Sequence, residues 1–132
     1  MAKYAYPAIF TEDGSFYSVD FPDLEGCFTQ GDDIVNALEM ARDALSLMLC
    51  SMEDGDVPIP AASDISDLVI PEGEKGFVSM ISCDTFEYRK LYESKSVKKT
   101  LSIPSWLNEE AIKHNINFSQ VLQEALKARL GA

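Results

Sequence analysis

The chain has 132 residues, which is enough for one ordinary domain or for a domain of about 90 residues with a small appendage. Its composition, 46% hydrophobic and 25% charged, is typical of a packed globular protein rather than a disordered chain. The net charge of -11 argues against a nucleic-acid coat or a protein held on an anionic membrane. No apolar run approaches the roughly 18–20 residues that cross a bilayer.

The three cysteines indicate the redox compartment. Cys27, Cys50 and Cys83 are odd in number and widely spaced, which fits neither a disulfide framework nor a zinc knuckle. The start of the chain lacks the apolar stretch of a secretory signal peptide. We therefore expect a cytoplasmic protein whose thiols are reduced and pack as small core residues, with no bound metal and no cofactor.

Charge is distributed unevenly along the chain. Residues 1–94 carry 5 Lys and Arg against 19 Asp and Glu, a net charge of -14, whereas residues 95–132 carry 6 basic and 3 acidic residues, a net charge of +3. Chance clustering of charges is one reading. The other, which we adopt, is two domains with different partners, residues 1–90 and residues 91–132.

The acidic part predicts a small sheet. β-favouring residues bounded by turn residues predict four strands, at residues 4–10, 15–21, 27–30 and 77–83. Glu12-Asp13-Gly14 forms a turn of hairpin type between the first two strands. Pro7 cannot donate a backbone hydrogen bond, so it predicts an edge position or a strand end for the first strand.

A long helix is predicted between the third and fourth strands. Residues 34 to about 54 contain no Gly or Pro, and apolar residues recur at helical spacing. Asp32 or Asp33 is a suitable N-cap, and Gly55 is placed to end the helix. No acidic residue falls at a core-facing position. Three strands, a helix and a returning strand make an α+β unit of order β-β-β-α-β.

The basic tail predicts one strand and two helices. Residues 97–103 alternate, with Lys98, Thr100 and Ser102 on the face opposite Val97, Leu101 and Ile103. Pro104 suits the first turn of a helix that runs to about His114, where Asn115 takes a left-handed turn. Asn117 and Gln120 form a capping box for the second helix. That helix carries one apolar stripe: Phe118, Val121, Leu122, Ala125, Leu126 and Leu130.

A tail of this kind cannot fold alone, because its strand has no partner and fewer than about 40 residues rarely enclose a core. A second copy supplies the remedy: two strands pair antiparallel and four helices pack beneath them. The ribbon then presents Lys98, Thr100 and Ser102 to base edges in the major groove of DNA. The helix start at Asn117, Phe118 and Ser119 suits a DNA phosphate. Residues 96–130 resemble the ribbon-helix-helix family of DNA-binding domains; a helical hairpin that only dimerises is the alternative.

A second resemblance rests on the turn after the second strand. It reads Phe21-Pro22-Asp23-Leu24-Glu25-Gly26-Cys27, and Thr29-Gln30-Gly31-Asp32 then enters a helix with alanines at positions 37, 41 and 44. Over residues 4–84 the sequence resembles HicB-type antitoxins, in which a degenerate, partial RNase H-like domain precedes a ribbon-helix-helix domain in one known arrangement. Glu25 stands where that family most often has Pro, which predicts a looser turn.

The resemblance implies a function. HicB-type proteins neutralise a small basic HicA-type toxin that cleaves mRNA, and they repress their own operon. Acidic side chains of the first domain would take the place of RNA phosphates on the toxin. We expect Asp20, Phe21, Asp23 and Glu25 near the toxin contact. We also expect a homodimer through the C-terminal domain, and a tetramer if the first domains pair as well.

Two other functions remain open at this point. The first is a ribbon-helix-helix transcription regulator whose acidic domain senses a metal or a small molecule. The second is a residual two-metal nuclease using Asp13, Asp20, Asp23 and Glu25; we expect no enzyme, because all four lie in the turn-rich first strands. His114, the single histidine, is expected to interact with a helix C-terminus, and Trp106 is expected to pack.

Overall fold

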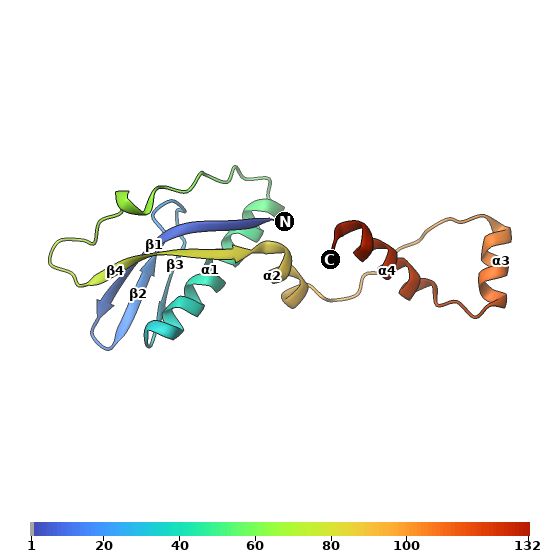
Figure 1. Cartoon of the computed structure of the whole chain (residues 1–132), viewed down its shortest axis with the longest axis horizontal. Coiled ribbons are helices and arrows are strands. Elements are labelled where there is room, and N and C mark those ends of the chain that lie inside the picture. Colours follow the sequence, from blue (N-terminus) through green and yellow to red (C-terminus); the bar gives the residue numbers. More distant parts are fainter. Residues whose placement is uncertain (1) are drawn as a thin grey trace. The chain divides into compact units, whose positions relative to one another are not determined.

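The computed structural model describes residues 2–132, which form two compact units (Figure 1). The first unit ends at Lys95 and the second spans Ser96–Ala132. The division falls five residues beyond the boundary expected at residue 90, because helix α2 (Thr85–Tyr92) packs on helix α1 (Ile34–Asp54) and belongs to the first unit. None of the helices formed by residues 2–132 has the length and apolar character needed to cross a bilayer.

The first unit contains a four-stranded antiparallel sheet, which confirms the α+β prediction. The strands are β1 (Lys3–Asp13), β2 (Phe16–Asp20), β3 (Phe28–Gly31) and β4 (Gly76–Asp84). They lie in the order β3-β2-β1-β4, with β1 and β4 side by side in Figure 1. The hairpin turn between β1 and β2 places Gly14 at a φ of 65°, where glycine avoids the strain that a side chain would cause.

The edge position or strand end predicted from Pro7 is wrong, because β1 lies between β2 and β4 and Pro7 lies inside the strand. The register explains how the proline is tolerated. Pro7 lies opposite Met80 of β4, whereas the pairing with β2 begins only at Ile9. On the β2 side the ladder therefore has no partner at Pro7, and no backbone hydrogen bond is lost there.

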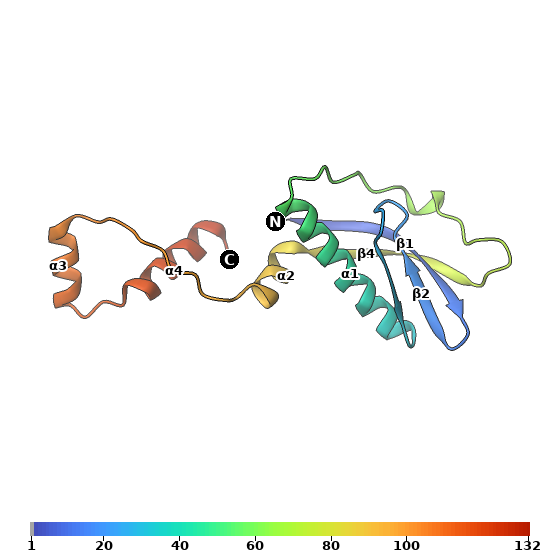
Figure 2. The same cartoon turned by 180° about the vertical axis from the view of Figure 1, so that it is seen from behind.

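Alternate side chains of the sheet pack against α1, which covers one face (Figure 2). Ala37, Ala41, Leu45 and Leu49 recur along the buried side of the helix, and the small alanines let it lie close to the strands. Phe10 stacks on Phe77 with ring centroids 4.7 Å apart. Complete burial of a side chain such as Phe10 contributes about 2–3 kcal/mol, so this layer stabilises the sheet and helix together.

All three cysteines are free and buried, which confirms that they are small core residues. Cys83 lies in β4 and Cys50 in α1, as expected. Cys27 immediately precedes β3 rather than lying within it. Burial raises the pKa of the Cys27 thiol to about 11, with a further contribution from the charge of Asp20.

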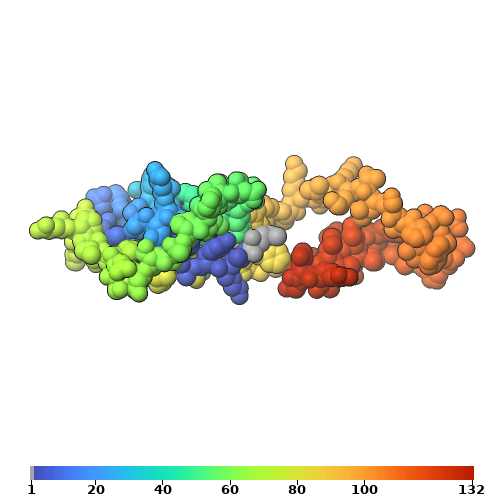
Figure 3. All heavy atoms as spheres, turned by 90° about the horizontal axis from the view of Figure 1, so that it is seen from above, coloured from blue at the N-terminus to red at the C-terminus, as the bar shows by residue number. Residues whose placement is uncertain are grey.

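Residues 55–75 cross the first unit without regular structure apart from one short 3-10 helix, η1 (Ile65–Asp67). In Figure 3 this segment, in green, lies over one face of the unit. Several contacts hold it in place, among them hydrogen bonds from Tyr6 and to Asp23. The hydroxyl of Tyr6 donates to the carbonyl oxygen of Pro60, and Asp23 accepts hydrogen bonds from the backbone and the hydroxyl of Ser63.

The second unit contains two helices, α3 (Ser105–Lys113) and α4 (Phe118–Leu130). Pro104 is the N-cap residue of α3 rather than a member of its first turn. His114 ends α3, and its Nδ1 lies 2.8 Å from the carbonyl oxygen of Glu110, as expected of a residue at a helix C-terminus. Asn115 has a φ of 54°, which confirms the predicted left-handed turn.

Half of the predicted capping box forms at the start of α4. The Asn117 side chain accepts from the backbone N–H of Gln120 at 3.1 Å, as predicted. The amide of Gln120 does not reach back to Asn117. It donates instead to Glu124 at 3.1 Å, one turn further along the exposed surface.

The strand predicted at residues 97–103 is not formed in the single chain, where residues 93–104 have no regular secondary structure. A strand exists only through hydrogen bonds to a neighbour, and these residues have none to pair with in one copy. Trp106 is 66% exposed, so the prediction that it packs is wrong for the chain taken alone. The strand remains a prediction for a paired state.

Candidate functional site

The turn between β2 and β3 is closed by main-chain hydrogen bonds. The backbone N–H of Phe21 donates to the carbonyl oxygen of Cys27. The N–H of Cys27 donates to the carbonyl oxygen of Leu24, and the N–H of Leu24 donates to the carbonyl oxygen of Phe21. Each of these hydrogen bonds is 3.1 Å long. Leu24 and Cys27 are buried in the core, while Glu25 is exposed. None of these three bonds involves residue 25, so the looser turn predicted from Glu25 stays a prediction.

The Thr29-Gln30-Gly31-Asp32 segment fixes the entry into α1. A Cβ atom at Gly31 would lie 2.4 Å from the backbone of Ala37, so only glycine allows β3 to approach the helix this closely. Asp33 is the N-cap and accepts from the N–H of Asn36 at 2.7 Å. Asn36 in turn accepts from the N–H of Asp32 at 2.9 Å, which ties the end of the strand to the first turn of the helix.

The four residues predicted near a protein partner occupy different environments. Asp20, at the end of β2, and Glu25 are exposed. Phe21 is 1% exposed and packs in the core, so its side chain offers no contact surface. Asp23 is half-buried and accepts hydrogen bonds from Ser63 in residues 55–75, the long segment between α1 and β4, which gives Asp23 a structural role. The structure therefore brings two of the four, Asp20 and Glu25, to the surface.

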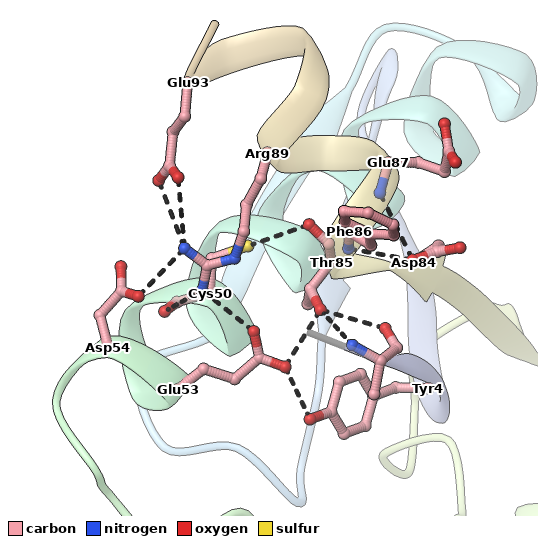
Figure 4. A network of polar contacts seen from close by, with 11 residues as sticks. Tyr4, Cys50, Glu53, Asp54, Asp84, Thr85, Phe86, Glu87, Arg89 and Glu93 are labelled. Carbon is pink, nitrogen blue, oxygen red and sulfur yellow. Dashed lines mark hydrogen bonds and ion pairs between the residues drawn. The ribbon is translucent and has the colours of Figure 1, made fainter. Parts of the chain in front are cut away.

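A polar network that the sequence did not predict joins the end of α1 to α2 (Figure 4). Arg89 of α2 donates to Glu53 of α1 at 3.0 Å, and its side chain also lies 3.0 Å from Asp54. Glu53 also accepts from the hydroxyls of Tyr4, at 2.9 Å, and Thr85, at 3.0 Å. The Glu53 side chain is only 12% exposed, which corrects the expectation that α1 turns no acidic residue toward the interior.

Protonation in this network follows from its geometry. Burial alone would raise the pKa of Glu53, but hydrogen bonds, including those from Arg89, Tyr4 and Thr85, outweigh it and hold that pKa at about 2. The hydrogen bond to Glu53 raises the pKa of Arg89 above its ordinary value. Burial and the bond to Glu53 raise the pKa of Tyr4 to about 12. Glu53 and Arg89 are therefore both charged throughout the neutral range.

The residues predicted to contact DNA are exposed in the second unit. Lys98, Thr100 and Ser102 lie in the extended segment before α3. The other three predicted contacts, Asn117, Phe118 and Ser119, lie together at the start of α4. The two groups come from different elements, and nothing in a single chain tests whether they bind DNA.

The second unit has no buried residue among Ser96–Ala132. The stripe of α4 is largely exposed, including Val121, Leu126 and Leu130. Exposed apolar side chains also lie on α3 and in the segment before it: Val97, Leu101, Ile103, Trp106, Leu107 and Ile112. Apolar residues left uncovered throughout a unit of this size indicate a surface that a partner covers.

Both units have counterparts in a known family. A family model described as the HicB-like antitoxin of bacterial toxin-antitoxin systems matches residues 6–129. The chain belongs to this family. The match runs through both units of the HicB-like antitoxin, and it confirms the HicB-type resemblance drawn from the turn motif.

Solved structures and a curated relative extend the comparison. A toxin-antitoxin complex from Streptococcus pneumoniae contains a chain 31% identical to the HicB-like antitoxin, with a TM-score of 0.63; the alignment covers 96% of this chain and 99% of that one. A chain of a HicA3 and HicB3 toxin-antitoxin complex is 20% identical, with a TM-score of 0.53, over 61% and 99% of the two chains. An uncharacterised 14.9 kDa protein of Haemophilus phage HP1 is 26% identical over 77% of this chain and 74% of its own length.

Within residues 2–132 no three or more His, Cys, Asp or Glu side chains are grouped to ligate a metal ion. Glu53 and Arg89 are the residues of interest that sequence reasoning missed. The one available signal was Asp84, which caps α2 by accepting from the N–H groups of Phe86 and Glu87 and would have predicted that helix.

Proposed function

We propose that this antitoxin binds and neutralises a HicA-type mRNA-cleaving toxin through its first unit. We propose that it also represses its own operon through paired second units. The observation that carries the proposal is the family match over residues 6–129, because it includes both units in one chain. The protein would act by binding and not by catalysis.

The charge and the fold of the first unit support the toxin-binding role. Residues 1–94 carry a net charge of -14, which favours fast encounter with a basic partner. One sheet face is covered by α1, and the opposite face is partly open for a partner: Asp20 and Phe28 are exposed there, whereas Pro7 is buried. A partial RNase H-like domain used only for binding would need this rigid sheet and no catalytic centre.

The second unit supports the role in repression. Its exposed apolar residues need a partner, and a second copy offers the same surface in return. In a ribbon-helix-helix dimer residues 97–103 of two chains would pair, and Lys98, Thr100 and Ser102 would reach base edges while the starts of the two α4 helices meet phosphates. Pairing of the first units as well would make a tetramer.

Co-expression with the small reading frame next to the gene tests the toxin-binding role. We expect a stable complex on purification and relief of the growth arrest that the neighbouring product causes by itself. Absence of a complex, together with unrelieved arrest, would refute it.

Binding of the purified protein to its own promoter DNA tests the repressor role. Lys98→Ala and Thr100→Ala should reduce the preference for operator over unrelated DNA while the dimer stays intact. Lys127→Ala, in the last turn of α4, removes the same charge away from the strand and is the matched control. Equal loss of preference in Lys127→Ala and Lys98→Ala would contradict the ribbon.

A further inference from the structure

A groove of about 520 Å³ lies on the sheet face that α1 leaves uncovered. The strand register defines this face: Ile9 lies opposite Asp20, and Asp20 opposite Phe28, on three neighbouring strands. The intervening residues Phe10 and Val19 point to the other face and are buried under α1. Pro71 and Glu74 of the long segment complete the groove at its rim.

Phe28 is the most conspicuous residue of the groove. It is 71% exposed, although phenylalanine is normally buried, and it lies on β3, an edge strand of the sheet. Besides Phe28 and the two acidic residues, the groove is lined by three apolar residues, Ile9, Val19 and Pro71, and by four uncharged polar ones. An exposed aromatic ring beside a rigid apolar surface is the usual form of an anchor in a protein interface.

The charges of the groove indicate the chemistry of its partner. Asp20 and Glu74 are the charged residues that line it, and within residues 2–132 neither makes an ion pair. Two carboxylates with no basic neighbour in the lining attract Lys or Arg side chains. The groove therefore fits a basic protein segment that also carries an apolar site for Phe28.

A second groove, of about 590 Å³ between α1, α2 and β4, fits such a partner less well. Its lining includes two basic residues, Lys3 and Arg42. Of its four acidic residues, Asp84 caps α2 and Glu87 forms an ion pair with Lys90 at 3.0 Å, which leaves Glu39 and Asp43 beside the two basic residues. A basic partner would have to displace these contacts or face like charges there.

We infer that the groove formed by Ile9, Asp20, Phe28 and Glu74 is the surface through which the antitoxin binds its toxin, with Phe28 as the apolar anchor and Asp20 and Glu74 as acceptors for basic side chains. This inference rests on the proposed function and assigns its contact surface. It keeps Asp20 from the sequence prediction and replaces the buried Phe21 and the structural Asp23 by Phe28 and Glu74.

Binding kinetics of the full chain with its co-expressed toxin test the inference. Phe28→Ala should weaken the complex by about 30-fold or more, mainly through faster dissociation, because an anchor acts after encounter. Asp20→Lys and Glu74→Lys should each weaken it by about 10-fold, mainly through slower association at low salt. All three side chains are exposed, so the variants should fold as the natural chain does.

Two charge reversals serve as matched controls. Glu72→Lys changes an exposed residue of the same segment as Glu74 that does not line the groove, and Glu87→Lys changes the second groove. Both should alter the dissociation constant by less than about 3-fold. If the natural chain binds the toxin and Phe28→Ala and Asp20→Lys bind equally well, the groove assignment is overturned while the proposed function stands. If the natural chain does not bind the toxin, the groove assignment and the proposed toxin-binding function are both refuted.

Discussion

Substitution of Glu53 by Gln tests how α2 is held on the first unit. The carboxylate of Glu53 accepts from Arg89, Tyr4 and Thr85 in a nearly buried site. Glutamine has almost the same shape but no charge, so the substitution removes the ion pair without opening a cavity. Asp54→Asn is the matched control: Asp54 lies one residue further along α1 and 3.0 Å from the same guanidinium, yet its side chain is 62% exposed.

The pKa of Glu53 gives the magnitude. Folding lowers that pKa from an ordinary value of 4.5 to about 2. At about 1.4 kcal/mol for each pKa unit, the charged form contributes about 3 kcal/mol to the free energy of unfolding. Because the folded pKa is the lower one, this contribution is fully present above pH 4.5 and is lost as the pH falls from 4.5 toward 2. Asp54→Asn should cost less than about 1 kcal/mol, because water screens an exposed pair.

Urea unfolding at a series of pH values measures both effects. All five tyrosines lie in the first unit and the single tryptophan lies in the second, so near-UV circular dichroism of tyrosine follows the first unit separately. We expect the free energy of unfolding of the natural chain to exceed that of Glu53→Gln by about 3 kcal/mol at pH 7, and we expect this difference to vanish near pH 2. A difference that stays constant between pH 7 and pH 2 would refute the assignment of the stabilisation to the charged carboxylate.

Two further predictions concern packing. Gly31→Ala should destabilise the first unit by about 1–3 kcal/mol in the same urea assay, because its Cβ would lie 2.4 Å from the Ala37 backbone. Gly55→Ala is the control: its Cβ would lie 3.4 Å from the nearest atom, so it should change the free energy of unfolding by less than about 1 kcal/mol. Equal losses in the two variants would contradict the close approach of β3 to α1 at Gly31. Leu126→Ala should cost the dimer about 2–5 kcal/mol per buried side chain and shift the mass found by sedimentation toward one chain, whereas Lys127→Ala should not. A monomeric natural chain at micromolar concentration would refute the pairing.

Local patterns predicted most of the first unit, because its elements carry their own signals. Asp33 capped α1 and Gly55 ended it as expected. The failures involve partners distant in sequence. Pro7 indicated an edge, but only the return of β4 about 70 residues later decides which strands flank β1. Glu53 lies 36 residues from Arg89, and no local spacing relates the two. Spacing along α1 could not distinguish a charged residue facing solvent from one facing a distant arginine.

The candidate site was predicted less well than the fold, for a related reason. Proximity to a turn was the basis for choosing Phe21 and Asp23, yet alternation along β2 turns Phe21 into the core. Predicting Phe28 as a contact residue would have required knowing that β3 is an edge strand. It would also have required knowing that the phenylalanine side chain points away from α1. Exposure on an edge depends on the order of strands in the sheet, which a single sequence does not display.

The tail presents a different case, because its predicted strand would need two chains to form. Residues 97–103 pair with nothing in one copy, and the stripe of α4 stays uncovered. Formation of the ribbon and burial of the stripe would therefore occur in the same step, so dimerisation and DNA binding would be lost together when Leu126 is shortened. In the proposed ribbon Lys98 and Thr100 would face outward, so their side chains would take no part in pairing and would be exempt from that coupling. Only substitutions on that outward face can separate recognition of the operator from assembly of the dimer.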